Sequence, residues 1–177
     1  VLTNHSDQPR ELLWKGRIGE QEFCKAVSLA AGEKRSESAS LHFDHPRLWW
    51  PNTYGEPWLY DASVAVEQDG VMSDSLSFKA GLRQFSYSTE GGRLTAWVNG
   101  RRVSGRGGNW GFSELNLRYT ARDYDIAVGY HKQMNFTMIR NWVGQTGDEE
   151  FYEACDRHGI MVWQDFWLAN PYDGPDP

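Results

Sequence analysis

The amino-acid sequence predicts a multidomain chain of β plus α/β class, with an all-β half at residues 1–88 and an α/β half at residues 89–177. Two observations support this fold class. In the first half, short apolar runs alternate with polar residues at a period of two, which is typical of half-buried strands. From Thr120 onward, apolar residues recur at helical spacing, and helices are expected to alternate with strands. A chain of 177 residues is long enough for one large or two small domains.

Four runs in the first half are expected to form strands: residues 12–14, 23–29, 38–42 and 60–66. Turn residues separate these runs, and the dipeptide Asp69-Gly70 after the fourth predicts a tight hairpin with a further strand. Short strands at this spacing indicate a β-sandwich of immunoglobulin-like type. The antibody pattern of two cysteines around a tryptophan is missing from the sequence, so a true antibody-type domain is not expected.

The second half opens with a strong hairpin signal, Asn99-Gly100, between two apolar runs. A helix is expected to begin at Thr120, because Thr120 and Asp123 have the spacing of a capping box ahead of an apolar face. A second helix is expected after Asp148, since acidic residues favour a first helical turn and Gly159 is a natural C-cap.

Strands are expected on either side of this second helix, at residues 136–139 and 160–163. Trp163 lies within the later strand and is expected in the core. The order strand, helix, strand, helix, strand requires parallel pairing with right-handed crossovers. Because three parallel strands with two helices would leave open sheet edges and an uncovered face, this half reads as the start of a larger α/β domain.

Composition excludes several classes of function. The net charge of -6 argues against a general nucleic-acid binder, and no apolar run approaches the ~20 residues that cross a bilayer. The two cysteines, Cys24 and Cys155, have no metal-type spacing and are both expected as buried free thiols. The sequence contains no zinc pattern, nucleophile elbow or phosphate-binding loop, so no metal and no cofactor is expected. The nine tryptophans are compatible with sugar binding, because indole rings stack on the apolar faces of sugars.

Candidate binding residues follow the three expected parallel strands. In such folds ligands bind beyond the C-terminal strand ends, and here each end carries a tryptophan with a polar or charged neighbour. The three groups are Asn109 with Trp110, Arg140 with Trp142, and Asp165 with Trp167. The tryptophans either pack at the rim or contact a ligand. Arg140 forms either a structural ion pair with Asp165 or a contact that supports a site.

Catalytic carboxylates are not expected within this sequence. A retaining glycosidase needs two carboxyl groups about 5–5.5 Å apart across the scissile bond. Glu149 and Glu150 are adjacent residues at a helix start, Glu114 lies in an expected loop, and Asp165 is a single acid at a strand end. None of the other three forms a credible pair with Asp165.

Five stretches resemble, in order, segments of the family 2 glycoside hydrolases. Residues 46–60 resemble the LWWPNGYG-type segment of the family's immunoglobulin-like domain, and residues 78–83 resemble the element that joins this domain to the catalytic barrel. Residues 97–110, 134–140 and 150–166 resemble the first, second and third barrel strands. Each stretch alone is moderately specific, whereas the ordered set across most of the chain is highly specific.

Two motifs resemble one branch of this family, that of the β-mannosidases, endo-β-mannosidases and exo-β-glucosaminidases. They are Asn109-Trp110 after the first barrel strand and Trp-Gln-Asp-Phe at residues 163–166. The β-galactosidase and β-glucuronidase branches usually show a histidine two residues after the asparagine and another three residues after the arginine. Gly111 and Val143 stand at these positions here, which counts against β-galactoside and glucuronide substrates.

The resemblance implies an immunoglobulin-like sandwich at residues 1–88, truncated at its N-terminus, followed by the first three β/α units of a TIM barrel. The parent protein would be a retaining hydrolase of β-mannosides or β-glucosaminides, with an oligosaccharide or glycan as its substrate. Its catalytic carboxylates, on the fourth and seventh barrel strands, are expected C-terminal to this chain, which would be inactive alone. Its jelly-roll domain and the rest of its barrel are expected as missing partners.

The resemblance also assigns roles to the candidate residues. Asn109, Trp110, Arg140 and Trp142 would line or support the sugar subsite nearest the nucleophile, and Asp165 and Trp167 would stand close by. The alternative function is a non-catalytic carbohydrate-binding or domain-interaction module. In that case Trp49 and Trp50 would form a binding plate, although packing against a neighbouring domain explains this pair better.

Overall fold

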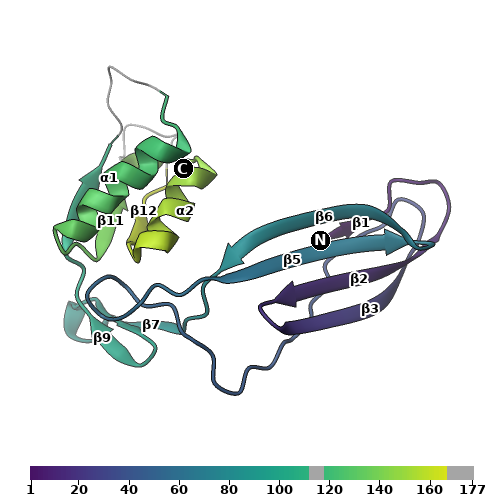
Figure 1. Cartoon of the computed structure of the whole chain (residues 1–177), viewed down its shortest axis with the longest axis horizontal. Coiled ribbons are helices and arrows are strands. Elements are labelled where there is room, and N and C mark those ends of the chain that lie inside the picture. The colour runs from purple at the N-terminus through teal and green to yellow at the C-terminus, as the bar shows by residue number, and fades with distance from the viewer. Residues whose placement is uncertain (112–117, 167–177) are drawn as a thin grey trace. The chain divides into compact units, whose positions relative to one another are not determined.

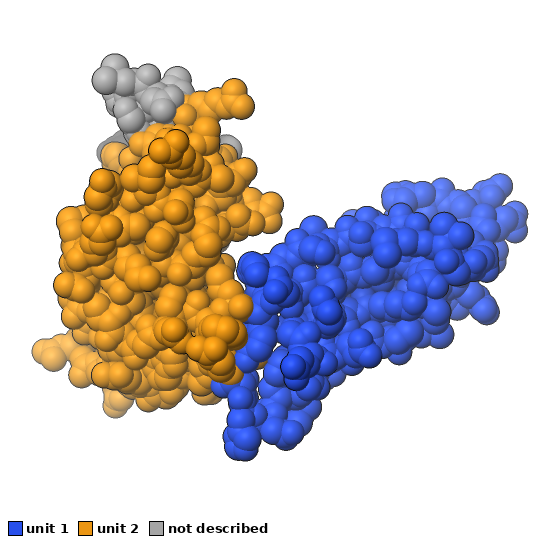
Figure 2. All heavy atoms as spheres, in the orientation of Figure 1, with its two compact units in different colours: residues 1–46, 60–80 blue, residues 47–59, 81–177 orange. Residues whose placement is uncertain are grey.

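The computed structural model describes residues 1–111 and 118–166. The described residues form mostly β-sheet with few helices, which confirms the expected class at this level. The chain divides into two compact units (Figure 2). The first comprises residues 1–46 and 60–80, and the second comprises residues 47–59 and 81–177. The predicted domain division at residue 88 stays a prediction.

The first unit is an antiparallel sheet in the order β3-β2-β5-β6 (Figure 1). Its strands are β2 (Arg10–Ile18), β3 (Gln21–Leu29), β5 (Tyr60–Gln68) and β6 (Val71–Ala80). Two short strands, β1 (Leu2–Thr3) and β4 (Lys34–Arg35), pair separately. The hairpin predicted at Asp69-Gly70 is confirmed, because these residues join β5 to β6 with φ angles of 51° and 78°.

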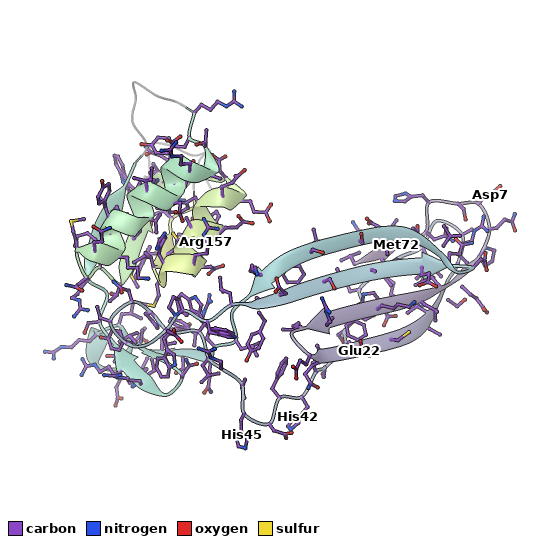
Figure 3. All side chains as sticks on the ribbon, viewed as in Figure 1. Asp7, Glu22, His42, His45, Met72 and Arg157 are labelled. Carbon is purple, nitrogen blue, oxygen red and sulfur yellow. The ribbon has the colours of Figure 1, made fainter. Side chains whose placement is uncertain are left out.

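Two predictions in the first unit were wrong. Residues 38–42 form no strand, since this serine-rich stretch brings little apolar surface to bury. His42 instead lies exposed within 3.2 Å of Asp44 in the extended segment after β4, where Figure 3 also labels His45. Cys24 is a free thiol but an exposed one, because it lies on the solvent side of β3, an edge strand of its sheet.

The second unit contains a small antiparallel sheet in the order β7-β8-β9. Its strands are β7 (Phe85–Ser88), β8 (Thr95–Val98) and β9 (Arg101–Val103), and a 3-10 turn, η1 (Glu90–Gly92), precedes β8. Asn99 and Gly100 connect β8 to β9 with φ angles of 51° and 75°, which confirms the predicted hairpin. Only residues that tolerate the left-handed conformation suit such a turn.

A parallel sheet in the order β10-β11-β12 follows in the same unit. The strands are β10 (Gly107–Trp110), β11 (Met138–Asn141) and β12 (Met161–Gln164). The helices are α1 (Ala121–Gln133) and α2 (Glu149–His158), with a 3-10 turn, η2 (Trp142–Gly144), after β11. The predicted alternation of parallel strands with helices is therefore confirmed. Strand β11 begins two residues later than predicted because Thr137 bonds to the loop before β10, where its Oγ1 accepts from Arg106 N and donates to Ser104 O.

Both helices lie over the same face of the parallel sheet (Figure 1). The predicted capping box is present, because Thr120 Oγ1 accepts from Asp123 N and the Asp123 carboxylate accepts from Thr120 N. The buried faces of α1 and α2 meet strand residues in one hydrophobic cluster. Its fully or nearly fully buried members are Trp110, Tyr124, Val128, Ile139, Phe151, Ala154, Cys155 and Ile160. The buried free thiol predicted at Cys155 is thereby confirmed.

Residues 47–59 belong to the second unit and pack where β12 begins. Trp49 is 1% exposed, and its Nε1 donates a hydrogen bond of 2.8 Å to the Asp156 carbonyl. The backbone N–H of Asn52 donates to the carbonyl of Gly159 at 2.7 Å. A buried indole cannot present a flat face to a sugar, so the preference for packing over a binding plate is confirmed for Trp49. No helix in the described part of the chain is long and apolar enough to cross a membrane.

Candidate functional site

The parallel sheet has two chemically different faces. Neighbouring side chains along a strand point to opposite faces, and the parallel register aligns Asn109 with Arg140 and Arg140 with Trp163. The next register row, which begins with Trp110 and Asn141, points toward the helices. The row with Asn109 therefore lies on the face that α1 and α2 leave uncovered.

A cavity of about 380 Å³ lies on this uncovered face. Its lining residues are Gly105, Gly107, Gly108, Asn109, Met138, Arg140 and Trp163. Gly107 is required there because a Cβ at this position would lie 1.7 Å from the Met138 carbonyl oxygen. Asn109 and Arg140 thus supply an amide and a guanidinium beside the ring of Trp163. The amide and the guanidinium can donate hydrogen bonds to hydroxyl groups, and the indole ring can pack on apolar carbon atoms.

Arg140 forms a bidentate ion pair with Asp165. Arg140 Nη2 lies 2.7 Å from Asp165 Oδ2, and Arg140 Nε lies 3.0 and 3.1 Å from the two carboxylate oxygens. The Asp165 side chain is 7% exposed, whereas the Arg140 side chain is half exposed toward the cavity. The predicted ion pair is therefore present, and it leaves part of the guanidinium free to face the cavity.

The protonation of Asp165 follows from this geometry. The hydrogen bonds from Arg140 hold the pKa of the Asp165 carboxyl below its usual range, against the opposing effect of burial. A weaker contribution comes from the backbone N–H of Val143. Asp165 is therefore ionised at neutral pH and saturated with donors, which makes it a poor proton donor for catalysis.

Trp142 follows β11 directly and begins the 3-10 turn η2. Its side chain is 43% exposed, so the indole has surface available for a ligand. Val143 comes next and has a φ of 48°, in the left-handed region that a branched side chain rarely adopts. Sequence reasoning identified Trp142 as a candidate but gave no sign of the strained turn beside it.

Trp110 occupies a different environment from the other candidates. Its side chain is 6% exposed in the cluster beneath the helices, and the ring centroid of Phe151 lies 5.1 Å away. The indole Nε1 donates to Thr146 Oγ1 at 3.0 Å, which satisfies its polar atom inside the core. Trp110 thus anchors the end of β10 from the helix side and does not line the cavity.

A polar cluster under the loop after β11 was not predicted. The buried amide of Asn141 donates to the carbonyl of Thr146 at 2.7 Å and to Gln164 Oε1 at 2.8 Å. Asn141 Oδ1 accepts from the backbone N–H of Thr146 at 3.2 Å, and the Tyr152 hydroxyl donates to Gln164 Oε1 at 2.8 Å. Each buried polar group finds a partner, so the cluster fixes the loop to the ends of β11 and β12.

The structure brings together part of the predicted set. Asn109 and Arg140 share one cavity, Asp165 is bonded to Arg140, and Trp142 is exposed at the adjoining strand end. Trp167 lies outside the described residues. Trp163 was wrongly predicted to lie in the core, because it is 48% exposed and lines the cavity. Alternate residues of a strand point to the same face, so Trp163 shares a face with Asp165. This alternation in the sequence was the signal for the position of Trp163.

The described residues contain no group of three or more metal-ligating side chains. Within those residues the cavity lining also includes no carboxylate. The arrangement offers hydrogen-bond donors, a guanidinium and aromatic surface, which suit recognition of a hydroxyl-rich ligand.

Comparison with known proteins identifies the family. The model of glycosyl hydrolases family 2 matches residues 1–83. A mannosylglycoprotein endo-β-mannosidase from Lilium longiflorum is 42% identical over 139 residues, which cover 76% of this chain and 14% of that protein. β-Mannosidase B from Aspergillus terreus is 34% identical over 151 residues, which cover 81% of this chain and 18% of that protein.

A solved structure supports the same relationship. The exo-chitosanase of Amycolatopsis orientalis superposes with a TM-score of 0.82 at 25% identity, over 92% of this chain and 19% of that chain. The chain therefore belongs to family 2 of the glycosyl hydrolases. Curated relatives within the family include β-mannosidases, an endo-β-mannosidase and exo-β-D-glucosaminidases, which is the branch predicted from the two motifs. The chain spans between 14% and 20% of the length of these relatives.

Proposed function

We propose that this chain is part of a retaining glycoside hydrolase that cleaves β-mannosides or β-glucosaminides. The observation that carries the proposal is the row of Asn109, Arg140 and Trp163 around one cavity, next to the exposed ring of Trp142. The printed names of the relatives supply the sugar classes, namely β-mannoside and β-D-glucosaminide. The substrate of the intact protein would accordingly be an oligosaccharide or glycan that contains one of these units.

The proposed architecture is an immunoglobulin-like sandwich followed by the first three β/α units of a TIM barrel. The antiparallel sheet of the first unit supports the sandwich. The parallel order β10-β11-β12, with α1 and α2 on one face, supports the barrel segment, because barrel helices lie outside and barrel strands face inward. In this arrangement the cavity lies on the barrel's inner side, with Trp142 and Asp165 at the strand ends that carry barrel active sites.

Each candidate residue then has a distinct proposed role. Asn109 and the free part of the Arg140 guanidinium would bind sugar hydroxyls, and Trp142 would pack on an apolar face of the sugar. Asp165 would hold Arg140, and Trp110 would support the end of β10 from the core. Trp167, outside the described residues, is proposed to lie near the same subsite.

We place the catalytic carboxylates outside this chain. Within the described residues, the ionised Asp165 is paired with Arg140, while Glu149 and Glu150 lie exposed at the start of α2. A retaining mechanism needs one carboxylate free to attack and a second that carries a proton, about 5–5.5 Å away. Neither Asp165 nor the adjacent Glu149 and Glu150 provide such a pair, and the 177-residue chain is proposed to be inactive on its own.

An activity panel on the intact gene product tests the proposal. We expect hydrolysis of p-nitrophenyl β-D-mannoside or β-D-glucosaminide and at least about 100-fold lower kcat/KM for the β-galactoside and β-glucuronide, because sites built to bond one hydroxyl pattern reject another strongly. The 177-residue chain alone serves as the matched control and should release no p-nitrophenol. Hydrolysis by that chain alone, or a preference for the galactoside, would refute the proposal.

A further inference from the structure

The loop that follows β11 contains a residue in an unfavourable backbone conformation. Val143 has φ 48° and ψ 23°, in the left-handed region. Its branched Cβ makes this conformation costly, since the left-handed region suits glycine and, less often, asparagine. Such a residue keeps its conformation only where surrounding contacts impose it, and residues of this kind gather at functional sites.

Asp165 supplies one of these contacts. Its Oδ2 accepts a hydrogen bond of 3.3 Å from the backbone N–H of Val143, and the same oxygen accepts from Arg140 Nη2 at 2.7 Å. The carboxylate is almost fully buried, so water cannot readily replace either donor. One side chain therefore restrains both the guanidinium beside the cavity and the turn after β11.

The other contacts fix the two ends of the turn. The Asn141 side chain exchanges two hydrogen bonds with the backbone of Thr146, at 2.7 and 3.2 Å. The N–H of Gln145 donates to the carbonyl of Trp142 at 3.2 Å. The left-handed residue Val143 directly follows Trp142, whose indole is half exposed at the end of the strand.

We propose that Asp165 is a positioning residue, whose carboxylate holds the left-handed turn at Val143 and thereby fixes Trp142, together with Arg140, beside the bound sugar. This inference rests on the proposed function for the identity of the ligand. It extends the role of Asp165 from holding Arg140 alone to holding the turn beside Trp142 as well. The strain at Val143 is then the reason that the loop needs the carboxylate.

Kinetics of variants of the intact gene product test the proposal. Asp165→Asn should raise KM roughly tenfold, the effect of one lost charge-assisted hydrogen bond, while kcat changes less than about threefold. Adding Val143→Gly should bring KM back to within about threefold of the wild type, because glycine adopts the left-handed turn without help from a carboxylate. The matched control is Asp125→Asn, which alters the contacts of Asp125 with Arg157 and His158 and should leave KM unchanged.

A second readout reports on Trp142 without any sugar. In protein labelled with 5-fluorotryptophan, the 19F resonance lost in Trp142→Phe belongs to Trp142. We expect Asp165→Asn to shift or broaden this resonance, and the added Val143→Gly to restore it. An unchanged resonance and KM in Asp165→Asn, or no rescue by Val143→Gly, would overturn the positioning role. Failure of the wild type to hydrolyse either sugar would instead overturn the proposed function, while the 19F comparison still tests Asp165.

Discussion

At the scale of single residues, the contact with Arg140 determines the protonation and the hydrogen bonding of Asp165. The ion pair that was one of the two expectations for Arg140 is present, and the same carboxylate also accepts from a backbone N–H, which the sequence did not indicate. Trp110, expected either to pack at the rim or to contact a ligand, is buried, whereas Trp163, expected in the core, is half exposed. Two tryptophans in the same sheet therefore differ in role because of the face on which each lies.

The Asp165 contact predicts a specific pH response. Its folded-state pKa is held below the ordinary value of 3.8 by hydrogen bonds from Arg140. The stabilisation from this ion pair is therefore fully present above pH 3.8 and is lost as the pH falls below that value, through the folded-state pKa. A 13C titration of the Asp165 carboxyl should give a midpoint below 3.8 in the wild type and a higher midpoint in Arg140→Ala. Equal midpoints in the two proteins would contradict the assignment of the shift to Arg140.

At the scale of elements, the turn that joins α2 to β12 is hydrogen-bonded to the segment of residues 47–59. Gly159 has a φ of 73°, and a Cβ there would lie 3.0 Å from Asn52 N and 3.1 Å from the Trp50 carbonyl. Its backbone carbonyl accepts the Asn52 N–H. The glycine is therefore required both for the C-cap and for the close approach of the neighbouring segment.

Gly159→Ala is predicted to lower the free energy of unfolding by more than about 1 kcal/mol, since alanine is strained at positive φ and would also push the 47–59 segment away. The matched control is Gly100→Ala, where φ is 75° but open space surrounds the added Cβ. Urea denaturation of the two variants should show the larger loss for Gly159→Ala. Equal losses would mean that the backbone conformation alone, and not the close approach, accounts for the requirement.

At the scale of the whole molecule, α1 and α2 cover one face of the parallel sheet, and no helix of the described residues covers the other. Within the described residues, β10 and β12 are its edge strands, and Trp163 is half exposed on the face opposite α1 and α2. Unpaired strand edges and exposed apolar surface promote association between molecules. The proposed explanation is that further barrel strands cover this face in the intact protein.

The 177-residue chain is accordingly predicted to self-associate. Size-exclusion chromatography with light scattering should show an apparent mass that rises with protein concentration. Trp163→Lys should reduce this association while leaving the helix content unchanged, because Trp163 is half exposed and is not a member of the hydrophobic cluster under the helices. A chain that stays monomeric over the same concentration range and unfolds in one cooperative step would contradict the proposed barrel segment.

The elements that local sequence specifies were predicted well. The capping box at Thr120, the hairpins at Asp69-Gly70 and Asn99-Gly100, and the C-cap at Gly159 depend on residues close together in the chain. The same holds for the buried faces of α1 and α2, because their apolar residues recur in the sequence at helical spacing. The failed strand at residues 38–42 had a weak alternation but few apolar side chains, and it has no pairing partner among the described residues.

Sequence patterns alone indicated the family, the order of strands and helices, and the candidates Asn109, Arg140, Trp142 and Asp165. The folded chain was needed to show which of these residues share a cavity, that Trp110 is a core residue, and that Val143 adopts a left-handed turn. The physical reason is the range of the interactions involved. Caps and turns depend on neighbours along the chain, whereas the sheet face of a side chain and the strain at Val143 depend on contacts between separate strands.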